Sequence, residues 1–315
     1  MDPQGLLDSI SRPAAAVVYE TDSFLSVLLE EAITASPDPL NRLVHSACRA
    51  GSHANAMVAG HQAAVRHLFP DTPLDAITAF CVSEKRGPHP KYIETRLEEA
   101  DGRFTISGQK MWGTMAPPAT LLYVAASRGV VGGQNQLVMV GVETTADGIK
   151  QIPLPPERQA GAVPICDLEF EQVPVAQERI YSKDAYTHYI KPFRLVEDVF
   201  STLASQIVLY RLGGSTGMSP ADREDLLGLI VQGYAIGQSD MESAGAVLLL
   251  TSYLRASQQH WNRLAARWAD ADVDLKPYWD PEREILTVAA RARQQRRINA
   301  WSSLGEPLQM DAAEG

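Results

Sequence analysis

The stretch ISGQKMWGTM, residues 106–115, decides how the middle of this chain is interpreted. It places a lysine and a tryptophan between a Ser-Gly turn and a Gly-Thr pair, and two prolines follow at Pro117 and Pro118. A large indole among strand-like residues is either core packing or the wall of a binding site, because an aromatic side chain serves both purposes. The flanking sequence favours one of these interpretations.

On both sides of this stretch the sequence predicts strands. The runs at 76–84, 120–127, 136–143 and 166–175 are apolar or alternate between apolar and polar residues. Asp101-Gly102 separates two alternating runs, which is among the strongest hairpin signals. We therefore expect an antiparallel β-barrel or sandwich domain over residues 75–181.

Helical periodicity surrounds the predicted β domain. Asp38 and Ser219 each precede a proline, as expected for N-caps followed by proline in the first turn. Asp280-Pro281 predicts the start of the last helix. The expected fold is α+β and multidomain, with an N-terminal helical segment (1–74), a central β domain (75–181) and a C-terminal helical bundle (182–315). Helices are predicted at 24–33, 39–51, 53–69, 192–213 and 241–270.

Composition narrows the possible classes of protein. A net charge of −10 argues against a general nucleic-acid-binding protein. The basic run ARARQQRRINAW (290–301) is either a local exception or a solvated helix face, and the second interpretation is favoured. Three cysteines without a CxxC pair give no metal signature and fit a reducing compartment. The start of the chain does not look like a signal peptide, and the apolar run at 244–250 is too short to cross a bilayer, so we expect a cytoplasmic protein without a membrane partner.

Three stretches in order resemble one family. FCVSEKRG (80–87), TRLEEADGRFTISGQKMWGTM (95–115) and CDLEFEQVPVAQERI (166–180) are similar to the β domain of acyl-CoA dehydrogenases. That family typically shows V-T-E-P-G-x-G-S-D, then a hairpin and N-G-x-K-x-W-I-T-N, then F-E-D-V-x-V-P. The resemblance implies the helical–β–helical fold and an FAD cofactor, whose flavin ring the family holds between its β domain and its C-terminal bundle.

The resemblance also implies cofactor-binding residues. Val82 and Ser83 match the first flavin wall of the family, and Trp112, Gly113 and Thr114 match the second. A hydroxyl at Ser83 or Thr114 can hydrogen-bond the polar edge of the isoalloxazine, whose N5 takes the hydride. The indole of Trp112 can cover the ring face. Considered without the resemblance, Trp112 would be a core residue and Thr114 an ordinary strand residue.

The chain also departs from the family pattern. The loop after the first strand becomes Lys85-Arg86-Gly87-Pro88-His89-Pro90, where the lysine and arginine either attract a CoA phosphate or form an exposed basic turn. The Arg-x-x-Phe-Gly motif is replaced by the glycine-rich segment 211–217, which either cradles a phosphate or simply ends a helix. The C-terminal Q-x-x-G-G-x-G motif and the glutamate after it are not recognisable, so the chain resembles a shortened, divergent member.

Some family members carry the catalytic base on the first helix after the β domain. Glu197 lies near that position and is the candidate catalytic residue, since α-proton abstraction from a thioester needs a carboxylate within reach. An alternative is that the charges on this helix form surface pairs, such as Arg194 with Asp198 at a spacing of four.

The sequence thus indicates an FAD-dependent, acyl-CoA dehydrogenase-like oxidoreductase acting on the CH–CH bond next to a thioester. Its expected partners are an acyl-CoA or other acyl thioester and further copies of itself in a homodimer or homotetramer, with no metal and no nucleic acid. One alternative is a flavin-free relative that acts as a partner subunit or binding module, because fold does not imply function. A flavin-dependent oxidase or hydroxylase on the same scaffold is a third.

Overall fold

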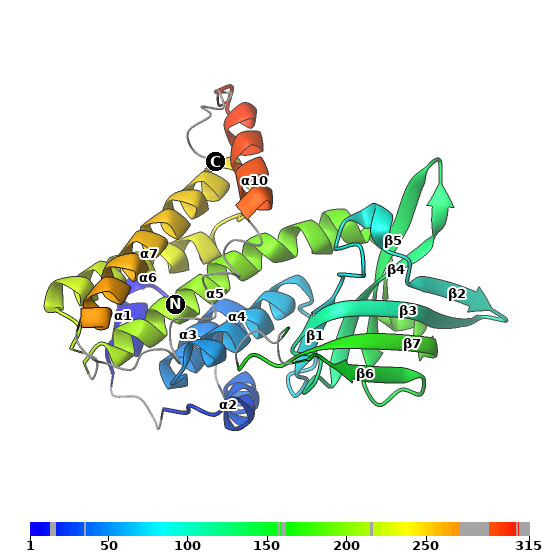
Figure 1. Cartoon of the computed structure of the whole chain (residues 1–315), viewed down its shortest axis with the longest axis horizontal. Coiled ribbons are helices and arrows are strands. Elements are labelled where there is room, and N and C mark those ends of the chain that lie inside the picture. Colours follow the sequence, from blue (N-terminus) through cyan, green and yellow to red (C-terminus); the bar gives the residue numbers. More distant parts are fainter. Residues whose placement is uncertain are drawn as a thin grey trace. The chain divides into compact units, whose positions relative to one another are not determined.

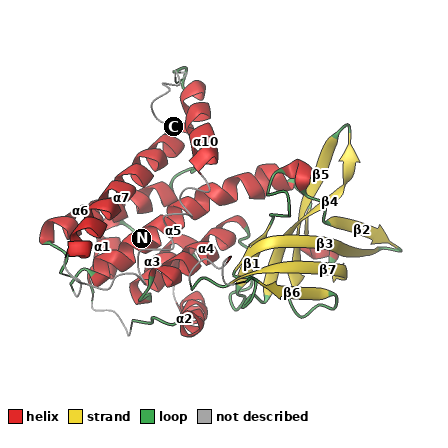
Figure 2. Cartoon of the chain, in the orientation of Figure 1, coloured by secondary structure: helices red, strands yellow, loops and turns green. Residues whose placement is uncertain are grey.

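The structure, a computed structural model, describes residues 1–12, 17–34, 36–155, 158, 162–214, 217–270, 290–306 and 308. It divides into two compact units. The helical unit consists of Met1–Tyr19, Leu43–Gly60 and Leu195–Gly315, and the sheet unit consists of Glu20–Arg42 and His61–Arg194. Figure 2 separates the helices and strands by colour. The three-part division at residues 74 and 181 stays a prediction.

Most helices of the described residues lie close to the predicted positions, but the helix Pro3–Ser11 was not predicted. Within the helical unit, α7 packs against α6 and α10, and α1 packs against α6 (Figure 1). A five-residue π-helical turn, Tyr186–Ile190, leads into α5. The helices are α1 (Pro3–Ser11), α2 (Thr21–Thr34), α3 (Pro39–Arg49), α4 (His53–Leu68), α5 (Lys191–Leu212), α6 (Pro220–Gln238), α7 (Ala244–Asp270) and α10 (Ala290–Ser303).

Both predicted N-caps are confirmed. The Asp38 side chain accepts a hydrogen bond from the backbone N–H of Asn41 at 2.8 Å, at the start of α3. Ser219 accepts one from the backbone N–H of Asp222 at 3.2 Å, at the start of α6. Each cap satisfies a backbone donor that the first helical turn leaves free, so the sequence determines where these helices begin. The predicted start at Asp280 lies outside the described residues.

The helical unit has an apolar core and a buried polar network. The Tyr253 hydroxyl donates to Oε1 of Gln206 at 2.6 Å, and Nε2 of Gln206 donates to the Ser257 hydroxyl at 2.6 Å. These side chains are at most 1% exposed, so they satisfy one another without water. One apolar cluster of this unit contains Leu209, Met218, Leu226, Trp261, Leu264 and Trp268.

The sheet unit is built on one sheet, which has eight strands among the described residues, in the order β6-β7-β3-β2-β4-β5-β8 with β1 on β4 (Figure 1). The Asp101-Gly102 hairpin is confirmed: β2 and β3 are antiparallel, and the two turn residues have φ values of 52° and 71°. The strands are β1 (Thr78–Cys81), β2 (Arg96–Ala100), β3 (Arg103–Thr114), β4 (Leu121–Val131), β5 (Gln134–Glu143), β6 (Ile149–Pro153), β7 (Ile165–Val175) and β8 (Ile180–Tyr181).

The sheet is mixed, which corrects the expectation of a wholly antiparallel domain. β1 runs parallel to β4 over four residue pairs, and β2 meets β4 in parallel at Arg96 and Ser127. Parallel pairing requires a crossover rather than a tight turn, and residues between β1 and β4 that include the β2–β3 hairpin provide it. The predicted fold class, helices around a central sheet domain, is confirmed.

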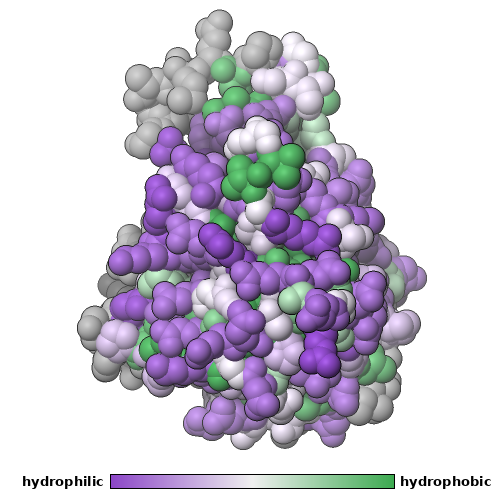
Figure 3. All heavy atoms as spheres, turned by 90° about the vertical axis from the view of Figure 1, so that its right-hand side faces the viewer, coloured by the Kyte–Doolittle hydropathy of each residue, from purple (hydrophilic) through white to green (hydrophobic). Residues whose placement is uncertain are grey.

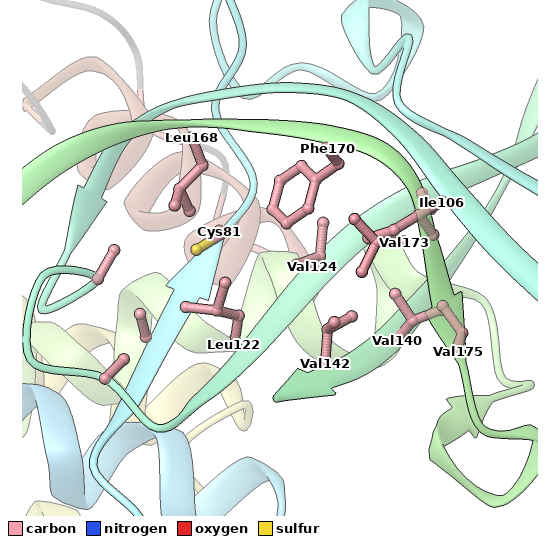
Figure 4. Close-up of a cluster of buried hydrophobic side chains, with 14 of the residues drawn as sticks. Cys81, Ile106, Leu122, Val124, Val140, Val142, Leu168, Phe170, Val173 and Val175 are labelled. Carbon is pink, nitrogen blue, oxygen red and sulfur yellow. The ribbon is translucent and has the colours of Figure 1, made fainter. Parts of the chain in front are cut away.

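One face of the sheet carries the core of this unit. Figure 4 shows side chains of β1, β3, β4, β5 and β7 that converge on a common interior. Their alternation along each strand places every second side chain inward, as period-two patterning requires. Core members that the figure labels include Cys81, Ile106, Leu122, Val124, Val140, Val142, Leu168, Phe170, Val173 and Val175.

The face in Figure 3 is largely hydrophilic, with a small hydrophobic patch. The most exposed large apolar side chains of the described residues are Val130 and Val131, at the β4–β5 hairpin, with 69% and 68% exposure. Isolated exposed apolar side chains are normal and need no partner. None of the helices among the described residues has a stretch long and apolar enough to cross a bilayer.

Candidate flavin-facing site

A β-bulge interrupts β3 at the tryptophan of the deciding stretch. The pairing of β3 with β7 shifts once between Ile106 and Gly108, is regular from Gly108 to Lys110, and resumes after a second shift at Gly113. Two residues of β3, Met111 and Trp112, therefore lie opposite a single residue of β7, Asp167. A bulge turns a side chain away from its regular direction, and bulges are common next to active sites. The Trp112 side chain is accordingly 47% exposed, so the interpretation of Trp112 as a core residue is wrong.

The bulge is held by polar contacts to Trp112. Its backbone N–H donates to Oδ1 of Asp167 at 2.9 Å. The guanidinium of Arg158 lies 4.3 Å from the centre of the indole, within cation–π range, and pairs with Asp167 at 3.1 Å. Asp167 therefore fixes both the backbone of Trp112 and the cation that packs on its ring.

The segment from Trp112 to Met115 is strained. Both of these residues have left-handed backbones, with φ values of 60° and 65°, and each costs about 1–2 kcal/mol relative to the usual conformation. Met115 is fully buried, and its N–H donates to the carbonyl of Pro164 at 2.7 Å. A Cβ on Gly113 would lie only 3.0 Å from the Ala116 side chain. Strain of this kind persists where the surrounding structure imposes it and clusters at functional sites.

The two predicted flavin walls lie next to each other. Val82 is buried and Ser83 is half-buried, directly after β1, and the Ser83 carbonyl accepts the N–H of Met111 at 2.8 Å. Thr114 is half-buried at the end of β3. Among the described residues, the hydroxyls of Ser83 and Thr114 make no hydrogen bond with any group of the protein. The structure thus brings the five predicted cofactor-binding residues together and leaves two hydroxyls available for a polar ligand edge.

A buried ion pair, which the sequence analysis missed, lies beside these walls. Nζ of Lys110 contacts Oε1 of Glu84 at 2.6 Å, and the two side chains are 0% and 8% exposed. Burial lowers the pKa of the Lys110 ammonium, and the Glu84 carboxylate opposes that effect. Burial alone would raise the pKa of Glu84, but the charge of Lys110 and its hydrogen bonds outweigh it, so the Glu84 pKa is below its usual value.

The same carboxylate organises the loop after β1. Glu84 accepts the backbone N–H groups of Glu94 at 2.8 Å and Thr95 at 3.1 Å, as well as the Thr95 hydroxyl at 2.8 Å. The loop that it closes carries exposed Lys85, Arg86 and Lys91. This arrangement fits the interpretation of these cations as an exposed basic turn, and any contact with a phosphate stays a prediction.

The thiols next to the walls are not suited to nucleophilic chemistry. Cys81 precedes Val82 and is buried, and burial raises its pKa to about 12. Cys166 pairs with Gly113 across the β3–β7 ladder, and burial followed by the charge of Asp167 raises its pKa to about 11. Both thiols therefore stay protonated near neutral pH.

The candidate base belongs to the other compact unit. Glu197 is half-buried on α5, in the helical unit, whereas the five cofactor-binding residues belong to the sheet unit. Its neighbour Asp198 is 6% exposed and pairs with Arg293 at 2.6 Å and Arg296 at 2.8 Å. The suggested pairing of Asp198 with Arg194 is thus replaced by contacts to α10, and these two arginines of the 290–301 run are mostly buried rather than solvated. The role of Glu197 stays a prediction.

The glycine-rich segment after α5 ends that helix, and the arginine before it has a structural task. Nη1 of Arg211 donates to the carbonyls of Ile10 at 3.1 Å and Arg12 at 2.9 Å, at the end of α1. These contacts satisfy carbonyls that the last turn of a helix leaves free. Residues 215 and 216 lie outside the described residues, so a phosphate cradle in this segment stays a prediction.

Comparison with known proteins gives one curated relative of note. The chain is 26% identical over 208 residues to mitochondrial isovaleryl-CoA dehydrogenase of Arabidopsis thaliana, a match that covers 64% of this chain and 47% of that relative. The chain therefore spans about half the length of the curated relative that it matches. No family model matches the sequence.

Solved structures share the fold. Butyryl-CoA dehydrogenase from Megasphaera elsdenii superposes with a TM-score of 0.67 and 12% identity, covering 95% of this chain and 99% of that one. The FAD complex of PigA superposes with a TM-score of 0.65 and 13% identity, covering 96% and 92%. The helical and sheet elements of this chain thus have counterparts throughout these structures. Together with the sequence match and the flavin-wall motifs, they show that the chain resembles acyl-CoA dehydrogenases and shares their fold.

Proposed function

We propose that this protein is an FAD-dependent oxidoreductase that acts on the carbon–carbon bond next to the carbonyl of an acyl thioester, such as an acyl-CoA. The observation that supports this most strongly is the bulged, strained segment from Trp112 to Met115. It exposes an indole and lies beside two hydroxyls, of Ser83 and Thr114, that have no partner among the described residues. Strain and unused polar groups at one place are typical of a site prepared for a ligand.

The residues present fit a flavin. Bound FAD would supply the hydride acceptor, at N5 of its isoalloxazine. The hydroxyls of Ser83 and Thr114 would donate to the polar edge of that ring, and the Trp112 indole would cover part of its face. Gly113 would contribute through its backbone, because the space beside its Cα is occupied by Ala116 and Cys166.

Glu197 would take the proton from the carbon next to the thioester carbonyl. A carboxylate can act as a general base when it lies within hydrogen-bond reach of the substrate and its surroundings are dry enough to raise its pKa. The half-buried position of Glu197 on α5 is compatible with the second requirement. Its alignment with the family members that carry the base on this helix supports the first.

A flavin-free binding module or partner subunit is the second candidate. It is supported by Arg211, which contacts α1 carbonyls although it stands where the family carries its phosphate-binding arginine. Without a replacement for that arginine, FAD would lose a charge-assisted contact to its pyrophosphate. The two candidates differ in whether the purified protein binds FAD.

The visible spectrum of the purified protein distinguishes them. The proposed function predicts a yellow protein, or one that becomes yellow after incubation with FAD and removal of excess cofactor. A protein that stays colourless and leaves the fluorescence of added FAD unchanged would refute the flavin function and favour the binding module. If the protein binds FAD, anaerobic addition of an acyl-CoA should bleach the flavin band, because reduction of the flavin removes its visible absorption.

Glu197→Gln tests the base. The variant should bind FAD like the wild type but lose bleaching by about 10²-fold or more, as expected for loss of a general base. Glu178→Gln, on an exposed 3₁₀ turn, is the matched control and should bleach at the normal rate. Normal bleaching by the Glu197 variant would remove this residue from the reaction. We further expect a homodimer or homotetramer in the cytoplasm, which sedimentation and cell fractionation test.

A further inference from the structure

The Glu84–Lys110 pair stands between the two flavin-facing walls but takes no part in the proposed chemistry. Glu84 directly follows Ser83, and Lys110 precedes Trp112 by two residues. Nζ of Lys110 also approaches the Val82 carbonyl at 3.3 Å. Each partner of the ion pair is thus adjacent in sequence to one wall, and the Lys110 ammonium also contacts the first wall.

We propose that the Glu84–Lys110 ion pair is a positioning device, which fixes the first flavin-facing wall against the second and ties the loop 85–95 to both. The proposal rests on the flavin function proposed above. It assigns Lys110 and Glu84 as positioning residues that act through Ser83 and Trp112, not as catalytic residues.

The backbone contacts around the pair favour this role over simple packing. The Met111 N–H, next to Lys110, donates to the Ser83 carbonyl, next to Glu84, so the walls are joined by a backbone bond as well as by the ion pair. At the far end of the loop, Thr95 donates to Glu84 through both its N–H and its hydroxyl. The carboxylate therefore connects the beginning of the loop, its end and β3.

The surface of β3 is shaped to receive the end of this loop. Gly108 has a φ of 151°, and a Cβ there would lie 2.6 Å from the Thr95 Cα, which real side chains do not tolerate. Thr95 thus sits directly over the backbone of β3, two residues before Lys110. A displacement of Thr95 would be transmitted to the same stretch of β3 that carries the bulge.

Stability alone does not explain why a charged pair occupies this position. Taking two charges out of water is unfavourable, and replacing a buried ion pair by apolar residues is often neutral or stabilising. Buried pairs can instead enforce one arrangement among several, because only that arrangement satisfies both charges. Here the arrangement that satisfies both charges is the one that holds the walls and the loop together.

The test compares Lys110→Met, Glu84→Gln and the double variant with the wild-type protein. Hydrogen exchange of the peptide that contains the Glu94 and Thr95 amides reports the loop without any flavin, and titration with FAD reports the walls. The matched control is Lys150→Met, which removes an exposed pair with Glu169 at 3.3 Å in the same sheet.

For a positioning role, Lys110→Met should speed exchange at Glu94 and Thr95 by about tenfold or more, although Lys110 touches neither amide. The dissociation constant of FAD should rise by about tenfold or more. The double variant, which removes both charges, should regain the melting temperature but keep the fast exchange and weak FAD binding. Lys150→Met should leave all three quantities unchanged.

The proposal would be overturned if the double variant regained wild-type exchange rates and FAD affinity as well as the wild-type melting temperature. The pair would then act only through stability. Unchanged exchange at Glu94 and Thr95 in Lys110→Met would overturn the proposal too. If Lys110→Met fails to fold, the double variant and Glu84→Gln decide in the same way. If the wild type binds no FAD, the flavin function fails by itself, and the exchange measurements still decide whether the pair holds the loop.

Discussion

The connection between α4 and β1 depends on one buried arginine, and its replacement should destabilise the sheet unit strongly. Arg66 is 8% exposed and donates to four backbone carbonyls of this connection. The acceptors are Thr72 at 3.4 Å, Pro73 at 2.9 Å, Leu74 at 3.2 Å and Ala76 at 2.6 Å. Because β1 leads directly to Val82 and Ser83, Arg66 also helps to place the first wall.

The expected loss follows from the acceptors that Arg66→Met would leave behind. The bonds to Thr72 and Ala76 are buried, so water cannot easily replace the guanidinium there. A buried acceptor without a partner costs about 1–3 kcal/mol, so the two together cost about 2–6 kcal/mol. The desolvation that lowers the Arg66 pKa to about 10 is relieved in the variant and offsets part of this loss. We therefore expect a decrease of about 3 kcal/mol in the free energy of unfolding.

Arg66→Lys separates charge from shape. Lysine keeps the positive charge but lacks the planar fork that reaches several carbonyls at once, so about half of the loss should remain. Arg103→Met is the matched control, because Arg103 is exposed at the start of β3 and should change the stability by less than about 0.5 kcal/mol.

Urea unfolding at neutral pH, followed by circular dichroism, measures these differences by linear extrapolation. A loss below about 1 kcal/mol for Arg66→Met would refute the reasoning, because it would mean that water or a shifted backbone satisfies the carbonyls. Wild-type stability in Arg66→Lys would show that the charge suffices and that the fork does not matter.

Three further predictions concern other parts of the chain. Burial lowers the pKa of His53 from 6.5 to about 3, so between these pH values the imidazole is protonated in the unfolded chain but neutral in the folded chain. Stability should therefore fall as the pH drops from about 6.5 toward 3, by at most about 1.4 kcal/mol per pH unit. His53→Gln should flatten this part of a profile of melting temperature against pH. Gly148, directly before β6, has a φ of 89°, and a Cβ there would collide with the Glu171 carbonyl oxygen of β7. Gly148→Ala should lower the urea midpoint by an amount equivalent to about 2 kcal/mol or more, and an unchanged midpoint would show that the backbone before β6 can shift. Tyr253→Phe leaves Oε1 of Gln206 without its donor in a dry interior; we expect a loss of about 1–3 kcal/mol in urea unfolding, whereas a loss near zero would indicate that another donor takes over.

The elements whose signals are local could be predicted from the sequence. Asp38 and Ser219 act through the first helical turn, and Asp101-Gly102 acts through its own backbone conformation. Neighbouring residues suffice to specify each of these features. The parallel pairing of β1 with β4 is different, because it depends on which distant strands share a core, and no local pattern encodes that choice.

The sequence could predict that the two segments of the candidate site lie together, but not how they are built. The motifs placed Ser83 and Trp112 on two walls, and the structure has them next to each other. The exposure of Trp112 arises from a bulge, which depends on the register between β3 and β7 rather than on either strand alone. The ion pair had a readable signal. Lys110 lies four residues after the buried Ile106, and residues an even number of positions apart on a strand point to the same face. The Lys110 side chain is therefore predicted to point inward, where its charge needs a partner.

These features together explain why so large a side chain occupies the middle of the deciding stretch. A regular strand would bury the indole or leave it on the outer face, and only the bulge and the left-handed backbone give Trp112 its present direction. That backbone is unfavourable by itself, so contacts outside the segment must hold it. Asp167 holds the Trp112 amide on one side, and the Ser83 carbonyl holds Met111 on the other. One exposed ring is thus held by an unfavourable backbone conformation and several polar contacts. Such an arrangement is expected of a residue that binds a ligand rather than one that packs in the core.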